Sequence, residues 1–345
     1  MKEKLKVAMC VFLSLSIATL SVYCVGKNAT GRFSIFENTA LAAAYSTMPD
    51  GKIARNNAPA MNTPEKTEAS EHSRQNVITK KTDGNEKRYP VSEVTLSDEN
   101  VEGYNFSIRN TTSYNIDVEE MLGADLPFEF SDSRQVQVLI VHTHTCESYM
   151  SEDSDSYPES FYPRTTNNDL NVYAVGEVIK EKLKAKGVGV IHAKEQHDNP
   201  SYNGAYSRSY DTIRKYLDKY KGIKVVIDLH RDSMTQDDNT KLRPVFTHNG
   251  KKGAQIMIMS GYGANNSNFP TWEGNLNFAL KLQQKCESLY PGMMRPLYFG
   301  EFTYNMNANS GSLLIEFGTD ANTLEQAKYS AELFSDALSQ VLQNS

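Results

Sequence analysis

Hydrophobic and polar residues follow two different periods in the second half of the chain. Short runs of β-branched and apolar residues indicate buried strands, whereas apolar residues three or four apart indicate amphipathic helices. Strands are predicted over residues 136–142, 188–192, 223–230, 245–247, 255–259 and 313–317. Helices are predicted over residues 118–122, 170–186, 210–220, 275–289 and 324–342. Strands that alternate with helices predict an α/β fold, built on a mainly parallel sheet with helices on both faces.

The first 27 residues have a pattern of their own. Three lysines precede a nearly continuous apolar run from Val7 to Gly26. About 20 apolar residues suffice to span a bilayer as a helix, and basic residues before the run favour a cytoplasmic N-terminus. We therefore predict a transmembrane anchor over residues 1–27, with the rest of the chain outside the membrane. A cleaved signal peptide and a buried soluble helix are the alternatives.

Residues 28–100 contain little from which a core could be built. The stretch 46–90 is rich in Ser, Thr, Asn, Glu and Lys and has hardly a large apolar side chain. Such a composition cannot offset the entropy lost when a chain becomes ordered. We therefore predict a flexible linker over residues 28–100 and a single catalytic domain over residues 101–345.

Composition narrows the possible functions. The chain has 36 Lys and Arg against 42 Asp and Glu, and this balance offers no basic face for nucleic acid. Of its four cysteines, Cys10 and Cys24 lie in the apolar run, which leaves Cys146 and Cys286 for the rest. Two cysteines make neither a disulfide framework nor a four-thiolate metal site.

Metal-binding residue types stand where predicted strands end. His142 ends the first strand, His230 ends the third, and Glu316 ends a late apolar strand. Ligands in open α/β sheets bind outside the carboxyl ends of the strands, so we expect the three side chains to meet at one edge. A catalytic zinc ion takes three nitrogen or oxygen ligands and a water. Two histidines and a carboxylate would hold it, while Glu316 would take a proton from the water and pass it to a leaving amine.

These residues also have plainer interpretations. A histidine at a strand end is often a hydrogen-bonded structural residue, and a carboxylate there is often paired in a salt bridge. His144 and Glu147 follow His142 in the same loop, and His144 is either a ligand or a residue that orients one. Asp228, two residues before His230, either accepts the ring N–H of that histidine or caps a helix.

Five stretches of the chain closely resemble the stage II sporulation protein P family. They read H-T-H-T-C-E-S-Y (142–149), N-N-D-L-N-V-Y-A-V-G (167–176), H-D-N-P-S-Y-N-G-A-Y-S-R-S (197–209), D-L-H-R-D-S (228–233) and S-L-L-I-E-F-G (312–318). The resemblance runs from about residue 105 to the C-terminus. It implies a fold similar to that of zinc-dependent N-acetylmuramoyl-L-alanine amidases, and therefore an amidase-like catalytic domain.

The resemblance also implies an activity and a setting. The activity is hydrolysis of peptidoglycan at the amide between the lactyl group of the glycan and L-Ala of the stem peptide, with endopeptidase cleavage of peptide cross-links. The setting is engulfment of the forespore in an endospore-forming bacterium, with the catalytic domain outside the cell membrane at the sporulation septum. Expected partners are the stage II sporulation proteins D and M, with D acting as a lytic transglycosylase on denuded glycan.

One departure from the amidase pattern concerns the third zinc ligand. Amidases of this class usually carry a glutamate just before the first long helix, where this chain reads T-T-N-N-D. Asparagine is a poor zinc ligand, so the acidic ligand must come from elsewhere. Glu147 is therefore expected as the third ligand beside His142 and His230, with His144 and Asp169 as the alternatives.

Cys146 opens two further possibilities. It stands where serine is expected in relatives, and its thiolate would be a soft zinc ligand. With His230 it would also make a Cys/His peptidase acting on the cell wall. Glu147 and the acidic stretch 153–155 argue against this peptidase, because negative charge raises the pKa of a thiol. A non-catalytic wall-binding scaffold that has kept the fold is the remaining alternative.

Overall fold

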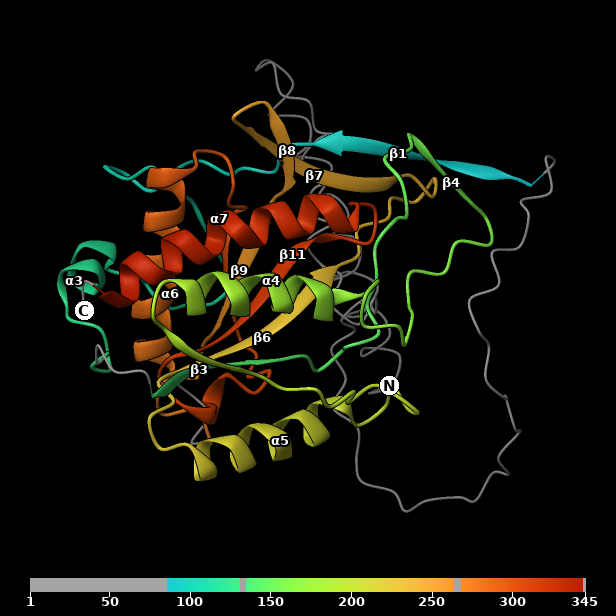
Figure 1. The fold of residues 1–345 in the computed structure, drawn as a ribbon. Helices are drawn as coiled ribbons and strands as arrows, with labels where there is room; N and C mark the ends of the chain where they lie inside the picture. The colour runs from blue at the N-terminus through green and yellow to red at the C-terminus, as the bar shows by residue number, and fades with distance from the viewer. Residues whose placement is uncertain (1–85, 131–134, 264–267, 344–345) are drawn as a thin grey trace, which may run out of the picture. The chain divides into compact units, whose positions relative to one another are not determined.

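The computed structural model describes residues 86–130, 135–263 and 268–343 (Figure 1). The predicted anchor over residues 1–27 and the predicted linker up to residue 85 lie outside the described residues. Within the described ranges, no helix combines the length and the apolar character needed to cross a membrane.

Seven strands form the main sheet, in the order β2-β10-β9-β11-β6-β3-β5. In that order they span Ile108–Asn110, Leu297–Gly300, Ile256–Gly261, Ser312–Thr319, Val225–Asp232, Val136–Val141 and Gly189–His192. Neighbouring strands run parallel except β11 with β9, which pair antiparallel. The predicted α/β class with a mainly parallel sheet is therefore confirmed.

Long helices cover both faces of this sheet (Figure 1). They are α4 (Val172–Ala185), α5 (Ala205–Lys219), α6 (Trp272–Leu289) and α7 (Leu324–Gln343). Successive side chains of a strand point to opposite faces. In β3, Val138 and Ile140 therefore join the core shared with α4, α6 and α7, whereas Leu139 and Val141 join a smaller cluster with α5.

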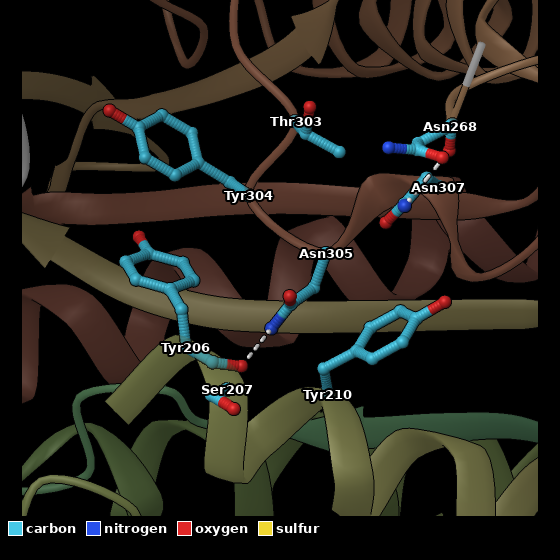
Figure 2. A pocket seen from close by; sticks show the side chains of 8 residues that line it. All are labelled: Tyr206, Ser207, Tyr210, Asn268, Thr303, Tyr304, Asn305 and Asn307. Atoms are coloured by element: carbon cyan, nitrogen blue, oxygen red, sulfur yellow. Dashed lines mark hydrogen bonds between the residues drawn. The ribbon is translucent and has the colours of Figure 1, made fainter. Parts of the chain in front are cut away.

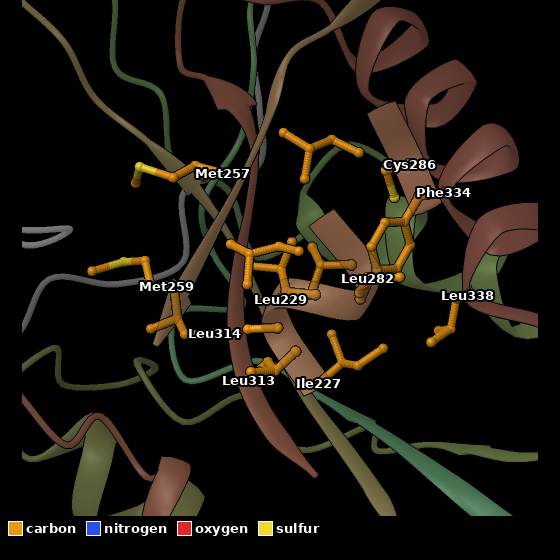
Figure 3. Packing of buried hydrophobic residues seen from close by; sticks show 14 of the residues in the cluster. Ile227, Leu229, Met257, Met259, Leu282, Cys286, Leu313, Leu314, Phe334 and Leu338 are labelled. Atoms are coloured by element: carbon orange, nitrogen blue, oxygen red, sulfur yellow. The ribbon is translucent and has the colours of Figure 1, made fainter. Parts of the chain in front are cut away.

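The core beneath α6 and α7 holds the strands that carry the predicted site. Ile227 and Leu229 of β6 lie in one buried cluster with Leu282 of α6 and Phe334 of α7 (Figure 3). All four side chains are at most 1% exposed. Tight packing of this kind fixes the strands rigidly, so the ends of β6 and β11 present their polar residues in a defined place.

A smaller four-stranded sheet has the order β4-β1-β7-β8. Its strands span Ser156–Pro158, Arg88–Val94, Lys241–His248 and Lys251–Ala254. β1 pairs in parallel with β7 and antiparallel with β4, and the nearby backbone N–H of Leu96 donates to the side chain of Gln255. Residues 88–94, which the sequence assigns to the linker, thus form a strand. The strand escapes prediction because distant partners stabilise it in a polar stretch of sequence.

Other differences from the predicted elements have local causes. The short helix α3 spans Val118–Gly123 as expected, and η1 spans Met306–Ala308. The strands β2, β4, β8 and β10 have only three or four residues each, too few to show a period. α5 begins five residues before its predicted start. It directly follows Gly204, which adopts a left-handed conformation (φ 79°) and provides no side-chain cap. No capping residue marks that start in the sequence.

Candidate active site

The carboxyl ends of β6 and β11 bring two of the predicted site residues together. Glu316 of β11 is the register partner of His230 of β6, and the two strands run parallel. Register partners on adjacent strands point to the same face, so their side chains stand beside each other. Both residues are completely buried. The sequence-based expectation that these two meet at one strand edge agrees with this geometry.

Two carboxylates and a second histidine surround His230. Oε2 of Glu147 lies 3.4 Å from Nδ1 of His230, and Oδ1 of Asp228 lies 3.0 Å from its Nε2. The His144 ring stands edge-on to the His230 ring, with centroids 5.4 Å apart. Asp228 is itself held by Thr143, whose backbone N–H and hydroxyl donate to its two oxygens at 2.8 and 2.6 Å. His230 therefore sits among groups that can bind a cation with it.

Buried atoms in this cluster have unused bonding capacity. Both carboxylate oxygens of Glu316 are buried without a hydrogen-bond partner among the described residues, whereas the two ring nitrogens of His230 make only the ion-pair contacts with Glu147 and Asp228. A buried polar group without a partner costs free energy, and native proteins satisfy nearly all of them. A carboxylate left in this state next to an imidazole and a second carboxylate is a candidate for binding a ligand.

The two glutamates of the cluster have pKa values shifted in opposite directions. Burial raises the pKa of Glu316 well above its usual range, and the nearby carboxylates of Asp232 and Glu147 act in the same direction. Burial also raises the pKa of Glu147, but Arg231 and His230 outweigh it and bring that pKa down to about 2. The pKa of Glu147 is thus lowered and that of Glu316 raised, a difference typical of sites in which two carboxyls take different roles.

His142 belongs to a different cluster. Its Nδ1–H donates to the carbonyl of Leu229 at 2.8 Å, and its Nε2 lies 2.7 Å from Nε2 of His192. Nδ1 of His192 in turn lies 2.6 Å from Oε1 of Glu177 on α4. α4 approaches so closely that a Cβ on Gly176 would come within 2.8 Å of the His192 ring and 3.0 Å of Nε2 of His142. His142 is therefore enclosed on the α4 face of the sheet.

The expectation that His142 shares a site with His230 and Glu316 is not met in this arrangement. His142 continues the alternation of β3 and faces α4, as Ile140 does. The loop that follows turns His144 toward the α5 face, where its ring lies beside that of His230. The strand-end rule identifies the edge of the sheet at which residues meet, but it does not say on which face each side chain lies.

The remaining residues considered from the sequence differ in their exposure to solvent. Asp169 is exposed in the turn before α4, whereas Glu147 is 1% exposed. Cys146 is buried, and its backbone N–H donates to the carboxylate of Asp198. Burial, together with the negative charge of Asp198, raises the pKa of the Cys146 thiol to about 12. A thiol in that state supplies almost no thiolate near neutral pH.

The donor set around His230 suits zinc in its chemistry. Imidazole nitrogen and carboxylate oxygen are the ligands zinc takes at catalytic sites, and His230, Glu147 and Glu316 supply atoms of these types. Across the described ranges, however, no group of three or more His, Cys, Asp or Glu side chains has the arrangement of a formed metal site. The residues therefore fit the ion by type, and binding it would require their side chains to rotate.

Aromatic rings that the sequence did not single out enclose the cluster. The Tyr202 ring stacks on His144 at 4.4 Å, and the guanidinium of Arg164 lies 5.0 Å from the centre of the Tyr202 ring. The Tyr206 ring lies nearly parallel to that of His230 at 6.4 Å. Both tyrosines fall in the 197–209 stretch that carried the family resemblance, which was the available signal for them.

Solved structures of amidases are similar in structure to this chain over about 60% of its length. They include an N-acetylmuramyl-L-alanine amidase from Mycobacterium abscessus (13% identity, TM-score 0.36, covering 61% of this chain and 97% of that one). The catalytic domain of the amidase CwlV from Bacillus (Paenibacillus) polymyxa var. colistinus is similar (12%, 0.35, 60% and 99%). So is the CwlD amidase from Clostridioides difficile, solved with the GerS lipoprotein (14%, 0.35, 60% and 97%).

Sequence comparison is more specific. Stage II sporulation protein P of Bacillus subtilis (strain 168) is 27% identical over 229 residues, which cover 63% of this chain and 53% of the relative. The chain thus spans about half the length of the curated relative it matches. The family model described as stage II sporulation protein P matches residues 32–339. As its motifs predicted, the chain belongs to the stage II sporulation protein P family.

Proposed function

We propose that this chain is a zinc-dependent hydrolase of cell-wall peptidoglycan. The bond cut is the amide between the lactyl group of N-acetylmuramic acid and L-Ala of the stem peptide, with stem-peptide cross-links as second substrates. One observation carries the proposal: Glu316 stands beside His230 with both of its carboxylate oxygens buried and without a hydrogen-bond partner within the described chain. A buried carboxyl without a partner, next to an imidazole, is a group that a hydrolytic site can use for proton transfer.

His144, His230 and Glu147 are the proposed zinc ligands. His144 takes the place that the sequence assigned to His142, because its ring lies 5.4 Å from that of His230 while His142 is engaged with His192. A zinc ion held there supplies a Lewis acid for the scissile carbonyl and for a water. Glu147, with its low pKa, offers a charged oxygen at any pH the cell experiences.

Glu316 is the proposed general base and acid. Its carboxylate would accept the proton of the attacking water and then deliver it to the departing amine, since an amine leaves an amide only when protonated. Its raised pKa makes Glu316 a stronger base toward the water than an ordinary carboxyl, and the proton that it accepts is then available for the amine. Asp228, fixed by Thr143, would orient His230.

The cellular setting is also proposed from the family. The enzyme would act outside the cell membrane at the sporulation septum during engulfment, tethered through residues 1–27. Stage II sporulation proteins D and M would be its partners. Two rival functions remain to be tested against it: a Cys/His peptidase built on Cys146, and a non-catalytic wall-binding scaffold. The raised pKa of the Cys146 thiol counts against the first.

Digestion of purified sacculi by the full chain tests the proposal. Amidase action should release new amino termini on L-Ala without new reducing sugar ends, and chelation should stop it until zinc is restored. Metal-stripped protein that keeps full activity would refute zinc catalysis. Intact sacculi after incubation with the zinc-loaded chain would instead favour the scaffold.

A further inference from the structure

A groove opens beside the candidate active site, between α5 and the loop that follows β10 (Figure 2). Its volume is about 700 Å³, within the usual range of small-ligand sites. Three tyrosines and three asparagines dominate its lining. We call it the tyrosine–asparagine groove, after Tyr206, Tyr210, Tyr304, Asn268, Asn305 and Asn307.

One ring is shared by the groove and the candidate active site. The Tyr206 ring lies 5.2 Å from that of Tyr304 in the groove. The same ring lies 6.4 Å from that of His230 and 5.4 Å from that of His144. A ligand that fills the groove therefore contacts a ring that also packs beside His230, the register partner of Glu316.

The backbone of the loop that lines the groove has an unusual conformation. Tyr304 and Asn305 both adopt positive φ angles, 36° and 61°, which residues other than glycine rarely take. The side-chain amide of Asn305 donates to the backbone carbonyl of Tyr206 at 3.1 Å (Figure 2). It also donates to the hydroxyl of Ser209 at 2.7 Å. These bonds tie the loop to α5. Unfavourable backbone held in this way is typical of sites shaped in advance for a ligand.

The chemistry of the lining selects among the parts of peptidoglycan. The described residues that line the groove offer phenol rings, amides and hydroxyls, and none of them is charged. A stem peptide bears free carboxylates, which would need a basic partner on leaving water. An N-acetylated sugar is uncharged, presents a flat C–H face to aromatic rings, and matches amides with its acetamido group and hydroxyls.

We propose that the tyrosine–asparagine groove binds the glycan strand, through an uncharged N-acetylated pyranose beside the scissile bond. This inference rests on the proposed function, since it gives the groove a role in the same reaction. With a sugar packed along α5, the lactyl amide attached to it lies on the His230 and Glu316 side of Tyr206. The charged stem peptide then extends away from the groove.

Titration of the full chain with chitotetraose tests the proposal. This oligomer of N-acetylglucosamine has no lactyl group and no peptide, so it lacks the amide that the proposed enzyme cuts. Chitotetraose should bind the wild type and Glu316→Gln alike, and Tyr210→Ala and Asn307→Ala should each weaken it about tenfold or more. Tyr162→Ala is the matched control, because Tyr162 is 74% exposed and does not line the groove. A free stem tetrapeptide should show no difference between wild type and groove variants.

Two results would overturn the proposal: no binding of chitotetraose by the wild type, or equal binding by both groove variants. A photoreactive chitotetraose on unmodified protein guards against variants that fold poorly. It should crosslink to α5 or to residues 303–307, and crosslinks confined elsewhere would reject the groove. Failure of the proposed hydrolase looks different, because sacculi would then stay intact while chitotetraose binding still depended on Tyr210.

Discussion

The two faces of the main sheet carry two clusters of histidine and carboxylate that differ in how their polar atoms are satisfied. On the α4 face, His142, His192 and Glu177 form a continuous chain of contacts between 2.6 and 2.8 Å. On the α5 face, both carboxylate oxygens of Glu316 lack a hydrogen-bond partner among the described residues. The same residue types thus serve structure on one side and offer chemistry on the other. Unused bonding capacity, more than residue identity, separates the two.

Electrostatics sharpen the contrast. Burial, together with His192, lowers the pKa of His142 to about 3, so that this imidazole stays neutral inside its hydrogen bonds. In the other cluster the pKa values of Glu147 and Glu316 move apart. A neutral, fully bonded ring has no proton to exchange, whereas two carboxyls of opposite tendency can divide metal binding and proton transfer between them.

Replacing one carboxylate in each cluster should give the largest difference in activity between the two faces of the sheet. Glu316→Gln removes the proposed base and should lower kcat/KM on sacculi about 10³-fold while zinc remains bound. Glu177→Gln, its counterpart on the α4 face, should stay within about threefold of wild type because it touches no reacting atom. Rates of amino-terminus release measure both. Equal losses in the two variants would erase the functional distinction between the faces.

The paired histidines give the second test. His144→Ala and His230→Ala should lower zinc affinity about 100-fold or more, since each removes a proposed ligand. His142→Ala should retain zinc, although the sequence alone assigns His142 to the metal. The zinc content of each variant is measured by mass spectrometry after dialysis against a weak chelator, and it shows which histidines hold the metal. Loss of zinc in His142→Ala, with retention in His144→Ala, would reverse the assignment.

Close packing on the α4 face predicts a loss of stability. In Gly176→Ala the new methyl group would meet the His192 ring at 2.8 Å, so overpacking should cost about 1–3 kcal/mol of unfolding free energy. Gly123→Ala is the matched control, because nothing lies within 4 Å of a Cβ there. Urea unfolding compares them. A Gly176→Ala variant as stable as this control would show that the α4 cluster is loosely packed.

The neutral state of His142 predicts an acid-sensitive fold. Its pKa is about 3 in the folded chain against an ordinary 6.5, so the unfolded chain binds a proton there that the folded chain refuses. Stability should therefore fall as pH drops from 6.5 toward 3, by about 1.4 kcal/mol per pH unit from this residue. His142→Asn should flatten the slope in urea unfolding between pH 4.5 and 6.5. An unchanged slope would mean that His142 is protonated in the native state.

The smallest effect is expected at Cys146. With its thiol pKa raised to about 12, Cys146→Ala should digest sacculi within about twofold of the wild-type rate. The assay is the same release of amino termini. Abolished activity in a folded, zinc-loaded variant would instead support the Cys/His peptidase.

Much of the fold follows from periodicity, and much of the site does not. Long strands such as β6 and long helices such as α7 are predicted correctly from the periodicity of their apolar residues. The rule that ligands bind at the carboxyl ends of strands also predicts that the ends of β6 and β11 lie close together. The strand at 88–94 escapes because β7 and β4, distant in sequence, stabilise it. The face toward which His142 points depends on where α4 packs, and that is a tertiary fact.

The tyrosine–asparagine groove lies further beyond prediction from sequence. It depends on left-handed backbone at Tyr304 and Asn305, and the sequence has no glycine at these positions to indicate it. It also depends on the first turn of α5, which lies before the apolar periodicity that predicted this helix. Irregular loops obey no period, so their pockets emerge only when packing fixes the backbone.

The position of β11 has a consequence for how the molecule opens. β11 is bonded to β6 on one side and to β9 on the other, so Glu316 lies on an interior strand. Amide hydrogens of such strands exchange with solvent only when much of the domain unfolds. The Glu316 amide should therefore exchange among the slowest, while Tyr304 and Asn305, on an irregular loop, exchange far sooner. Thermal fluctuations would then remodel the groove many times before they displace the carboxyl beside it.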